Sequence, residues 1–356
     1  MQTSSSNRLV GIDFAYALAI LGIVVFVFSF TIGDKVQSAL NHTRYFAILD
    51  VFPALFFFLN GLTVTLTMRD RKVSNRKLLV YMGKRGSVLM LIGLACCIIW
   101  PMNIFIATGL FYVATPFIAQ WNNILLRIIL LIVVLLGMLL LYMDVPTSTI
   151  YDMPNVRDGE IIGISGFILF NGYFSILPWF AFFCAGLLHG RTDIRPKGWL
   201  PPSSIIGLLL ILSTFFFQHY ARKIDNEGVL QARSDIFLLN IRLLYPAFCV
   251  FALGFSIIVT NAFIYFFRKF SITKILKFVQ TVSAYKYSVI FFHMLIGIIT
   301  LIASNRQFFH KKLVLVIYVV AATFATFYLT MLWRKRVSEK GPMEWLIKRI
   351  SGSTKN

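Results

Sequence analysis

The chain has 356 residues, of which 58% are hydrophobic and only 13% are charged, and its mean hydropathy is +0.79. The apolar stretches are too numerous to be buried in the core of one soluble domain. The composition therefore excludes an ordinary soluble protein. A net charge of +20 could indicate a protein that binds nucleic acid. The Lys and Arg residues gather in short segments between apolar runs, however, as membrane orientation requires. We therefore expect a lipid bilayer as the partner, and no nucleic acid.

Ten apolar stretches are long enough to predict membrane spans, because about 20 residues of helix cross the hydrocarbon core. The N-terminus leads straight into the first, which we interpret as a retained span and not a signal peptide. Only Pro101, Met102 and Asn103 separate the third and fourth stretches, which form either a re-entrant hairpin or two short tilted helices. The predicted spans are roughly 10–32, 46–68, 86–102, 104–120, 127–143, 163–189, 204–220, 242–267, 283–304 and 313–333.

The distribution of basic residues predicts the orientation of this all-α, polytopic chain. Most of the 34 Lys and Arg residues fall in the segments that face the cytoplasm if both termini are cytoplasmic, as the positive-inside rule requires. We therefore expect a multi-pass protein of the plasma (inner) membrane, with residues 1–356 forming a single transmembrane domain. The oligomeric state stays open, with a homodimer as one option.

The four cysteines and the histidines give no sign of a metal site. Cys96, Cys97, Cys184 and Cys249 all lie inside apolar runs, and none belongs to a CxxC pair. Structural disulfides and a zinc site are therefore not expected.

The stretch from residue 40 to residue 69 holds the strongest functional signal. A short polar loop with His42 runs into an apolar helix that opens with Asp50. Ionisable groups at the edge of hydrocarbon are costly to bury, and so they are candidates for function. A neutral imidazole can deprotonate an attacking amine or hydroxyl near pH 7, or accept an acyl group, and a nearby carboxylate would orient it.

Five segments of the chain, taken in order, resemble the sequence boxes of one family. They are Arg8-Leu-Val-Gly-Ile-Asp-Phe-Ala-Tyr-Ala-Leu-Ala-Ile-Leu-Gly, Asp50-Val-Phe-Pro-Ala-Leu-Phe-Phe-Phe-Leu-Asn-Gly, Ile176-Leu-Pro-Trp-Phe-Ala-Phe-Phe-Cys-Ala-Gly-Leu-Leu-His-Gly-Arg191, Ser283-Ala-Tyr-Lys-Tyr-Ser-Val-Ile-Phe-Phe-His293 and Gly341-Pro-Met-Glu-Trp-Leu-Ile-Lys-Arg349. The family is that of transmembrane acyltransferases similar to heparan-alpha-glucosaminide N-acetyltransferase, with its bacterial relatives of unassigned function.

The resemblance implies an acyl transfer across the bilayer. The donor would be cytoplasmic acyl-CoA, most simply acetyl-CoA, and the acceptor an amine or hydroxyl of an extracytoplasmic glycan or lipid-linked sugar. His42 lies where that family has its catalytic histidine, a few residues before the Asp-Val-Phe-Pro box, and Asp50 would orient it. The alternatives are a solvated loop histidine and an aspartate that only caps the second helix.

Four other residues are candidates for binding the acyl donor. Lys84 and Arg85 adjoin the third predicted span and suit the phosphates of coenzyme A, although contact with anionic lipid is the alternative. Asn171 carries an amide that needs partners in hydrocarbon. His293 either hydrogen-bonds a neighbouring helix or lines the donor path.

A second class of function is an inactive relative that serves as a scaffold or channel subunit of an envelope polysaccharide or lipid pathway. Tyr16 and Ala17 replace the family's Arg-Gly pair, and Val27 replaces a polar residue. Losing a buried cation that could hold a phosphate or carboxylate favours this alternative.

Overall fold

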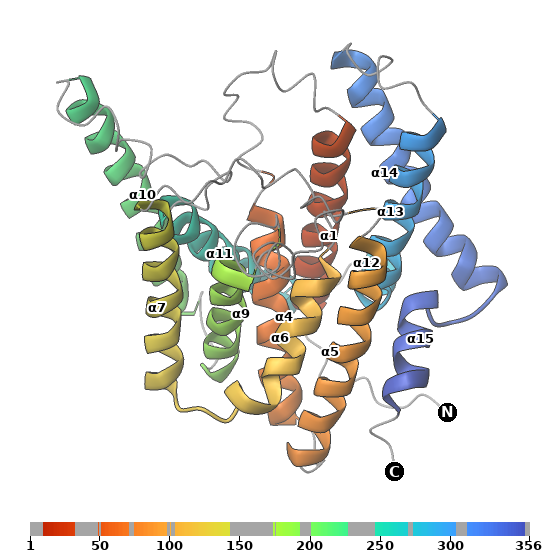
Figure 1. The fold of residues 1–356 in the computed structure, drawn as a ribbon, viewed down its shortest axis with the longest axis horizontal. Coiled ribbons are helices and arrows are strands. Elements are labelled where there is room, and N and C mark those ends of the chain that lie inside the picture. The colour runs from red at the N-terminus through yellow and green to blue at the C-terminus, as the bar shows by residue number, and fades with distance from the viewer. Residues whose placement is uncertain are drawn as a thin grey trace, which may run out of the picture.

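All the secondary structure that the structure describes is helical (Figure 1). The structure, a computed structural model, describes residues 10–32, 49, 51–70, 75–97, 100, 104–142, 174, 176–192, 201–226, 246–269, 273–303 and 312–352. The all-α prediction is confirmed for these ranges. The helices are α1 Val10–Ile32, α4 Val51–Asp70, α5 Asn75–Cys97, α6 Phe105–Ile118, α7 Asn123–Tyr142, α9 Ile176–Arg191, α10 Ser203–Asn226, α11 Pro246–Lys269, α12 Thr273–Ala284, α13 Lys286–Ala303, α14 Lys312–Arg336 and α15 Pro342–Ser351.

Five of the described helices are long and apolar enough to cross a bilayer. They contain the stretches Val10–Phe28, Val51–Arg69, Arg76–Cys97, Ala247–Phe267 and Leu313–Arg336. A sixth candidate is the pair α12 and α13, which passes the same test together but bends by 78° at its break. The chain is thus a helical membrane protein, whereas ten spans and two cytoplasmic termini stay predictions.

The outward faces of several helices are apolar, as contact with lipid requires. Ile128 of α7, Ile205 of α10 and Phe324 of α14 are all exposed, although each is a large hydrophobic residue. Exposing such apolar faces to water would be unfavourable, so contact with the hydrocarbon of a bilayer explains them.

Helices α5 and α6 are two separate helices that pack closely together. A Cβ atom added to Gly86 would lie 2.5 Å from the Gly109 carbonyl oxygen, and one added to Gly109 would lie 2.5 Å from the Met90 nitrogen. Small residues let two membrane helices approach this closely, which increases their van der Waals contact.

The third predicted span, 86–102, differs from the helix that the structure contains. Helix α5 begins at Asn75 and ends at Cys97, so Lys84 and Arg85 lie well inside it and not at its edge. The predicted start followed the charged residues, which usually mark the membrane surface. Here the chain keeps its helix through them because neighbouring helices cover part of the charged face.

Helices α4 and α9 form the second close pair. Added Cβ atoms at Gly61 and Gly186 would overlap the Phe183 and Phe58 carbonyl oxygens of the facing helix, respectively. The Thr65 hydroxyl also donates to the Leu187 carbonyl oxygen across the pair, at 3.0 Å. Two of the segments that resemble the family boxes therefore meet here through small residues.

Arg191, the last residue of the third box, caps a neighbouring helix. Its guanidinium donates to the Ala119 carbonyl oxygen at 2.9 Å and to the Trp121 carbonyl oxygen at 2.7 Å. It also donates to the Asn123 side-chain oxygen at 2.8 Å. These carbonyls follow α6, whose C-terminal carbonyls lack intrahelical partners, so Arg191 stabilises the turn between α6 and α7.

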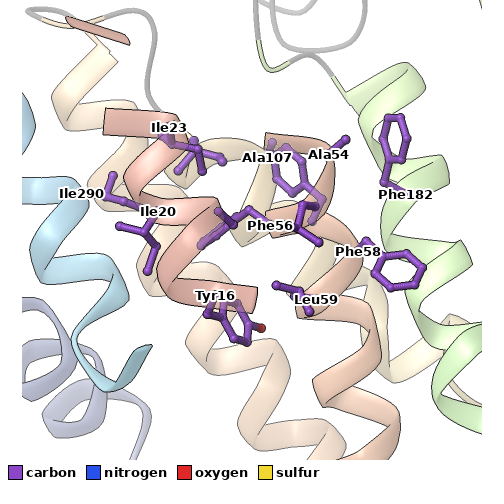
Figure 2. Packing of buried hydrophobic residues seen from close by; sticks show 14 of the residues in the cluster. Tyr16, Ile20, Ile23, Ala54, Phe56, Phe58, Leu59, Ala107, Phe182 and Ile290 are labelled. Atoms are coloured by element: carbon purple, nitrogen blue, oxygen red, sulfur yellow. The ribbon is translucent and has the colours of Figure 1, made fainter. Parts of the chain in front are cut away.

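The core lies between α1, α4, α6 and α9 and is rich in aromatic rings. Figure 2 shows Tyr16, Ile20 and Ile23 of α1 beside the helix that carries Phe56, and the Tyr16 and Phe56 ring centroids are 6.1 Å apart. On the opposite side of α4, the Phe57 ring lies 5.6 Å from Trp179 of α9. This core holds α4 at the centre of the molecule.

Candidate functional site

A buried polar cluster interrupts this core at Asn60, near the middle of α4. The Asn60 Oδ1 atom accepts hydrogen bonds from the Lys286 ammonium at 2.8 Å, the Tyr16 hydroxyl at 3.0 Å and the Tyr112 hydroxyl at 3.1 Å. The four residues come from α1, α4, α6 and α13. Because the exposed fraction of Asn60 is 1% and that of Lys286 is 9%, this is a group of polar side chains inside an apolar body.

Aromatic rings surround the Lys286 ammonium. Its Nζ atom lies 4.0 Å from the centroid of the Tyr16 ring and 5.2 Å from that of Tyr287. The Phe56 centroid is 5.7 Å away. The negative faces of aromatic rings attract cations, and this attraction offsets part of the cost of removing the ammonium from water.

A second cation, Arg85 of α5, borders the same rings. The centre of its guanidinium lies 5.3 Å from the Tyr287 centroid and 5.5 Å from the Tyr112 centroid. The Tyr287 hydroxyl in turn donates to the Tyr112 hydroxyl at 3.3 Å. Tyr287 thus contacts both Arg85 and Lys286. We call Tyr16, Asn60, Arg85, Tyr112, Lys286 and Tyr287 the Asn60 cluster.

Two carboxylates lie near the Asn60 cluster, and each accepts hydrogen bonds from residues outside the central Asn60 contacts. Glu344 of α15 accepts the Tyr287 backbone N–H at 2.8 Å and the Ser288 N–H at 3.3 Å, and it also accepts the Ser288 hydroxyl. Asp13 of α1 accepts the Ser283 hydroxyl at 2.7 Å. Both carboxylates also interact electrostatically with the Lys286 ammonium.

Two nitrogen atoms of the cluster are buried without a partner among the described residues. They are Nδ2 of Asn60 and Nε of Arg85. Buried polar atoms are nearly always hydrogen-bonded, and an exception needs a reason such as a missing ligand or water. The direction of both groups is set, because three donors hold the Asn60 oxygen and two rings flank the guanidinium.

The residues predicted to bind the acyl donor lie in different surroundings. Arg85 belongs to the Asn60 cluster, whereas Lys84 is exposed on α5. His293 of α13 is 1% exposed, and its ring contacts Phe28 and Trp100 edge to face, with centroids 5.5 and 6.5 Å away. No contact joins His293 to the cluster within the described ranges.

The two predicted catalytic residues, His42 and Asp50, and the predicted donor-binding residue Asn171 lie outside the described residues. The catalytic hypothesis therefore stays a prediction. What the structure contributes is the interior of the helix that Asp50 precedes, with Asn60 at its centre.

Four residues of the cluster, Asn60, Tyr112, Lys286 and Tyr287, were not among the predicted site residues. Tyr16 indicated the loss of a buried cation, yet the structure places a cation from α13 against its ring. The available signal was polar residues inside apolar runs, such as Asn60 after five consecutive apolar residues from Leu55 to Leu59.

Among the described residues, no group of three or more His, Cys, Asp or Glu side chains could hold a metal ion. The four cysteines, all among the described residues, form no disulfide, and Cys184 and Cys249 are buried.

These features define the class of the protein, which is a helical membrane protein with a cationic, tyrosine-rich cluster in its interior. No family model matches the sequence, and neither a curated protein nor a solved structure matches it.

Proposed function

We propose that the protein is a membrane-embedded acyltransferase of the plasma (inner) membrane. It would move an acyl group, most simply acetyl, from cytoplasmic acyl-CoA to an extracytoplasmic sugar or glycan. The observation that carries the proposal is the pair of cations, Arg85 and Lys286, which both lie close to the Tyr287 ring, at 5.3 and 5.2 Å from its centroid. Charged groups inside a membrane body are costly, and a ligand with phosphates or a polarised carbonyl gives them a use.

The reaction needs one proton acceptor and one site for the thioester. The acceptor nitrogen or oxygen would attack the thioester carbonyl carbon, the carbon–sulfur bond would break, and free coenzyme A would leave with the electron pair on sulfur. His42 would take the proton of the attacking group and return it to the thiolate, with Asp50 orienting the imidazole. In the variant with a covalent step, His42 itself would carry the acyl group in between.

The test is acetyl-CoA binding by the purified protein, followed as a shift of the thermal unfolding midpoint. We expect acetyl-CoA to raise the midpoint, because a ligand that binds only the folded state stabilises it. Arg85→Met should reduce the shift, and Lys77→Met, which changes an exposed cation of the same helix, should not. No shift in the unaltered protein at millimolar acetyl-CoA would remove the support for an acyl-CoA site.

A second candidate function is the inactive scaffold or channel subunit, and one observation favours it. Tyr16 is 3% exposed and its hydroxyl is paired with Asn60 and Thr63, both at 3.0 Å. A packed tyrosine thus fills the place of the family's arginine. This function predicts a stable partner that co-purifies with the protein, together with no response to acetyl-CoA.

A further inference from the structure

The Asn60 cluster contains more hydrogen-bond donors than acceptors. An ammonium offers three N–H donors, a guanidinium five and a side-chain amide two, and neither cation can accept. Against these, the Asn60 Oδ1 atom alone already takes three donors, from Lys286, Tyr16 and Tyr112. The partner that this cluster lacks is therefore an acceptor.

The net positive charge of the cluster also indicates that its missing partner is a negatively charged acceptor. Arg85 and Lys286 both approach the Tyr287 ring, at 5.3 and 5.2 Å from its centroid, and their positive charges repel each other. Such repulsion is strong where the dielectric is low. The nearby carboxylates of Glu344 and Asp13 accept bonds from the first turn of α13 and from Ser283, respectively. An added negative charge would offset the repulsion.

The unpaired donors show where that charge would lie. Asn60 Nδ2 and Arg85 Nε are both buried and make no hydrogen bond to a described residue. Asn60 is fixed by its three bonds and Arg85 by its two rings. A group with several acceptor oxygens would satisfy both nitrogens and the remaining Lys286 donors together.

We propose that the Asn60 cluster binds an oxyanion of the phosphate type, with Arg85, Asn60 Nδ2 and Lys286 as its donors. The site does not require acyl transfer, so it applies equally to an active enzyme and to an inactive relative. The phosphate has two plausible sources that share this chemistry, namely a soluble nucleotide and the headgroup of an anionic phospholipid.

The test compares two phosphate sources on lipid-depleted protein. Coenzyme A is titrated as the soluble source, and nanodiscs of phosphatidylglycerol are compared with nanodiscs of phosphatidylcholine as the lipid source. We expect one of the two to raise the thermal unfolding midpoint. Saturable binding of coenzyme A assigns a nucleotide, and a midpoint raised only by phosphatidylglycerol assigns a headgroup.

The most informative variant is Asn60→Asp. It keeps the oxygen that Lys286, Tyr16 and Tyr112 bind, and it replaces the unpaired Nδ2 by a second acceptor oxygen. We expect it to weaken anion binding at least tenfold and to raise the midpoint of the ligand-free protein, because the new carboxylate supplies the missing negative charge. Arg85→Met should also weaken binding tenfold or more.

Lys77→Met is the matched control, because it removes an exposed cation of the same helix. Its affinity should stay within twofold of the unaltered protein. The proposal is overturned if neither phosphate source acts, or if Lys77→Met weakens binding as much as Arg85→Met. Binding that survives His42→Ala while transfer is lost supports the anion site and the acyltransferase together. Binding by a protein without any transferase activity supports only the site.

Discussion

Ser288 and Glu344 link the N-termini of two helices to each other. The Ser288 hydroxyl, at the start of α13, donates to the Glu344 carboxylate and accepts the Met343 backbone N–H of α15 at 3.1 Å. Glu344 in turn accepts the Tyr287 and Ser288 N–H groups. Each helix thus satisfies free N–H groups of the other, which lack partners within their own helix. The contact fixes the first turn of α13, where Lys286 and Tyr287 enter the Asn60 cluster.

Glu344→Ala should destabilise the protein and loosen the start of α13. It removes a buried acceptor and leaves two backbone N–H groups and one hydroxyl unpaired, which costs about 2–4 kcal/mol in total. Unfolding in detergent, followed by circular dichroism, measures this loss. Glu339→Ala is the control, because the Glu339 side chain makes no hydrogen bond or ion pair in the described ranges, and it should change stability by less than about 0.5 kcal/mol.

The stability of the protein should depend on pH through Glu344. Burial raises the pKa of the Glu344 carboxyl above its ordinary value, although bonds from Ser288 and from the Tyr287 N–H act in the opposite direction. Between the ordinary value, about 4.3, and the raised pKa, the folded state therefore binds more protons than the unfolded state. Stability should fall as pH rises through that window.

Glu344→Gln separates this pH effect from the general titration of the surface. The amide keeps an acceptor oxygen and cannot titrate, so the fall in unfolding midpoint across the window should become shallower than in the unaltered protein. Equal slopes for the two proteins would show that the pKa of Glu344 is not raised above its ordinary value, about 4.3.

Gly86→Ala and Gly83→Ala test the close approach of α5 and α6. A Cβ atom at Gly86 would lie 2.5 Å from the Gly109 carbonyl oxygen, whereas one at Gly83 would lie 3.5 Å from the Pro116 side chain. Gly86→Ala should therefore separate the helices and cost about 1–3 kcal/mol. Gly83→Ala should be neutral or stabilising by up to about 1 kcal/mol, since alanine favours a helix. Similar unfolding midpoints for the two variants would contradict the close packing.

Tyr16→Phe and Tyr16→Arg test the role of Tyr16, which stands where the family that this segment resembles has an arginine. Phenylalanine keeps the ring under Lys286 and loses the hydroxyl that Asn60 and Thr63 pair with, which should cost about 1 kcal/mol. Arginine would add a positive charge close to the Lys286 ammonium, so it should destabilise the protein more than phenylalanine does. An arginine variant more stable than Tyr16→Phe would mean that the site tolerates a further cation.

The sequence predicted the helical membrane class, because long apolar runs have few other structures to form. It did not reveal that the Arg85 guanidinium lies against the rings of Tyr112 and Tyr287, which are distant in the chain. The role of Lys286 was hidden for the same reason, because its partner Asn60 lies 226 positions away. Local sequence patterns predict where helices lie in the chain. The residues that meet in the Asn60 cluster depend on which helices pack together, and local patterns do not predict that.

Three of the five boxes gain structural roles that their letters alone do not give. Gly61 and Gly186 allow α4 and α9 to touch, Arg191 caps α6, and Glu344 caps α13. These roles would be needed in any protein with this packing, active or not. These residues therefore explain the packing of this chain more directly than they explain any chemistry.

The most direct measurement is acetyl transfer by the purified protein in sealed vesicles, with labelled acetyl-CoA supplied on the cytoplasmic side and glucosamine on the other. The account predicts labelled acetyl-glucosamine on the far side, and a loss of at least about 100-fold in His42→Ala, the lower end for a general base, with an unchanged unfolding midpoint. Transfer that is absent from the unaltered protein with every sugar acceptor tried, or that His42→Ala leaves intact, would contradict it.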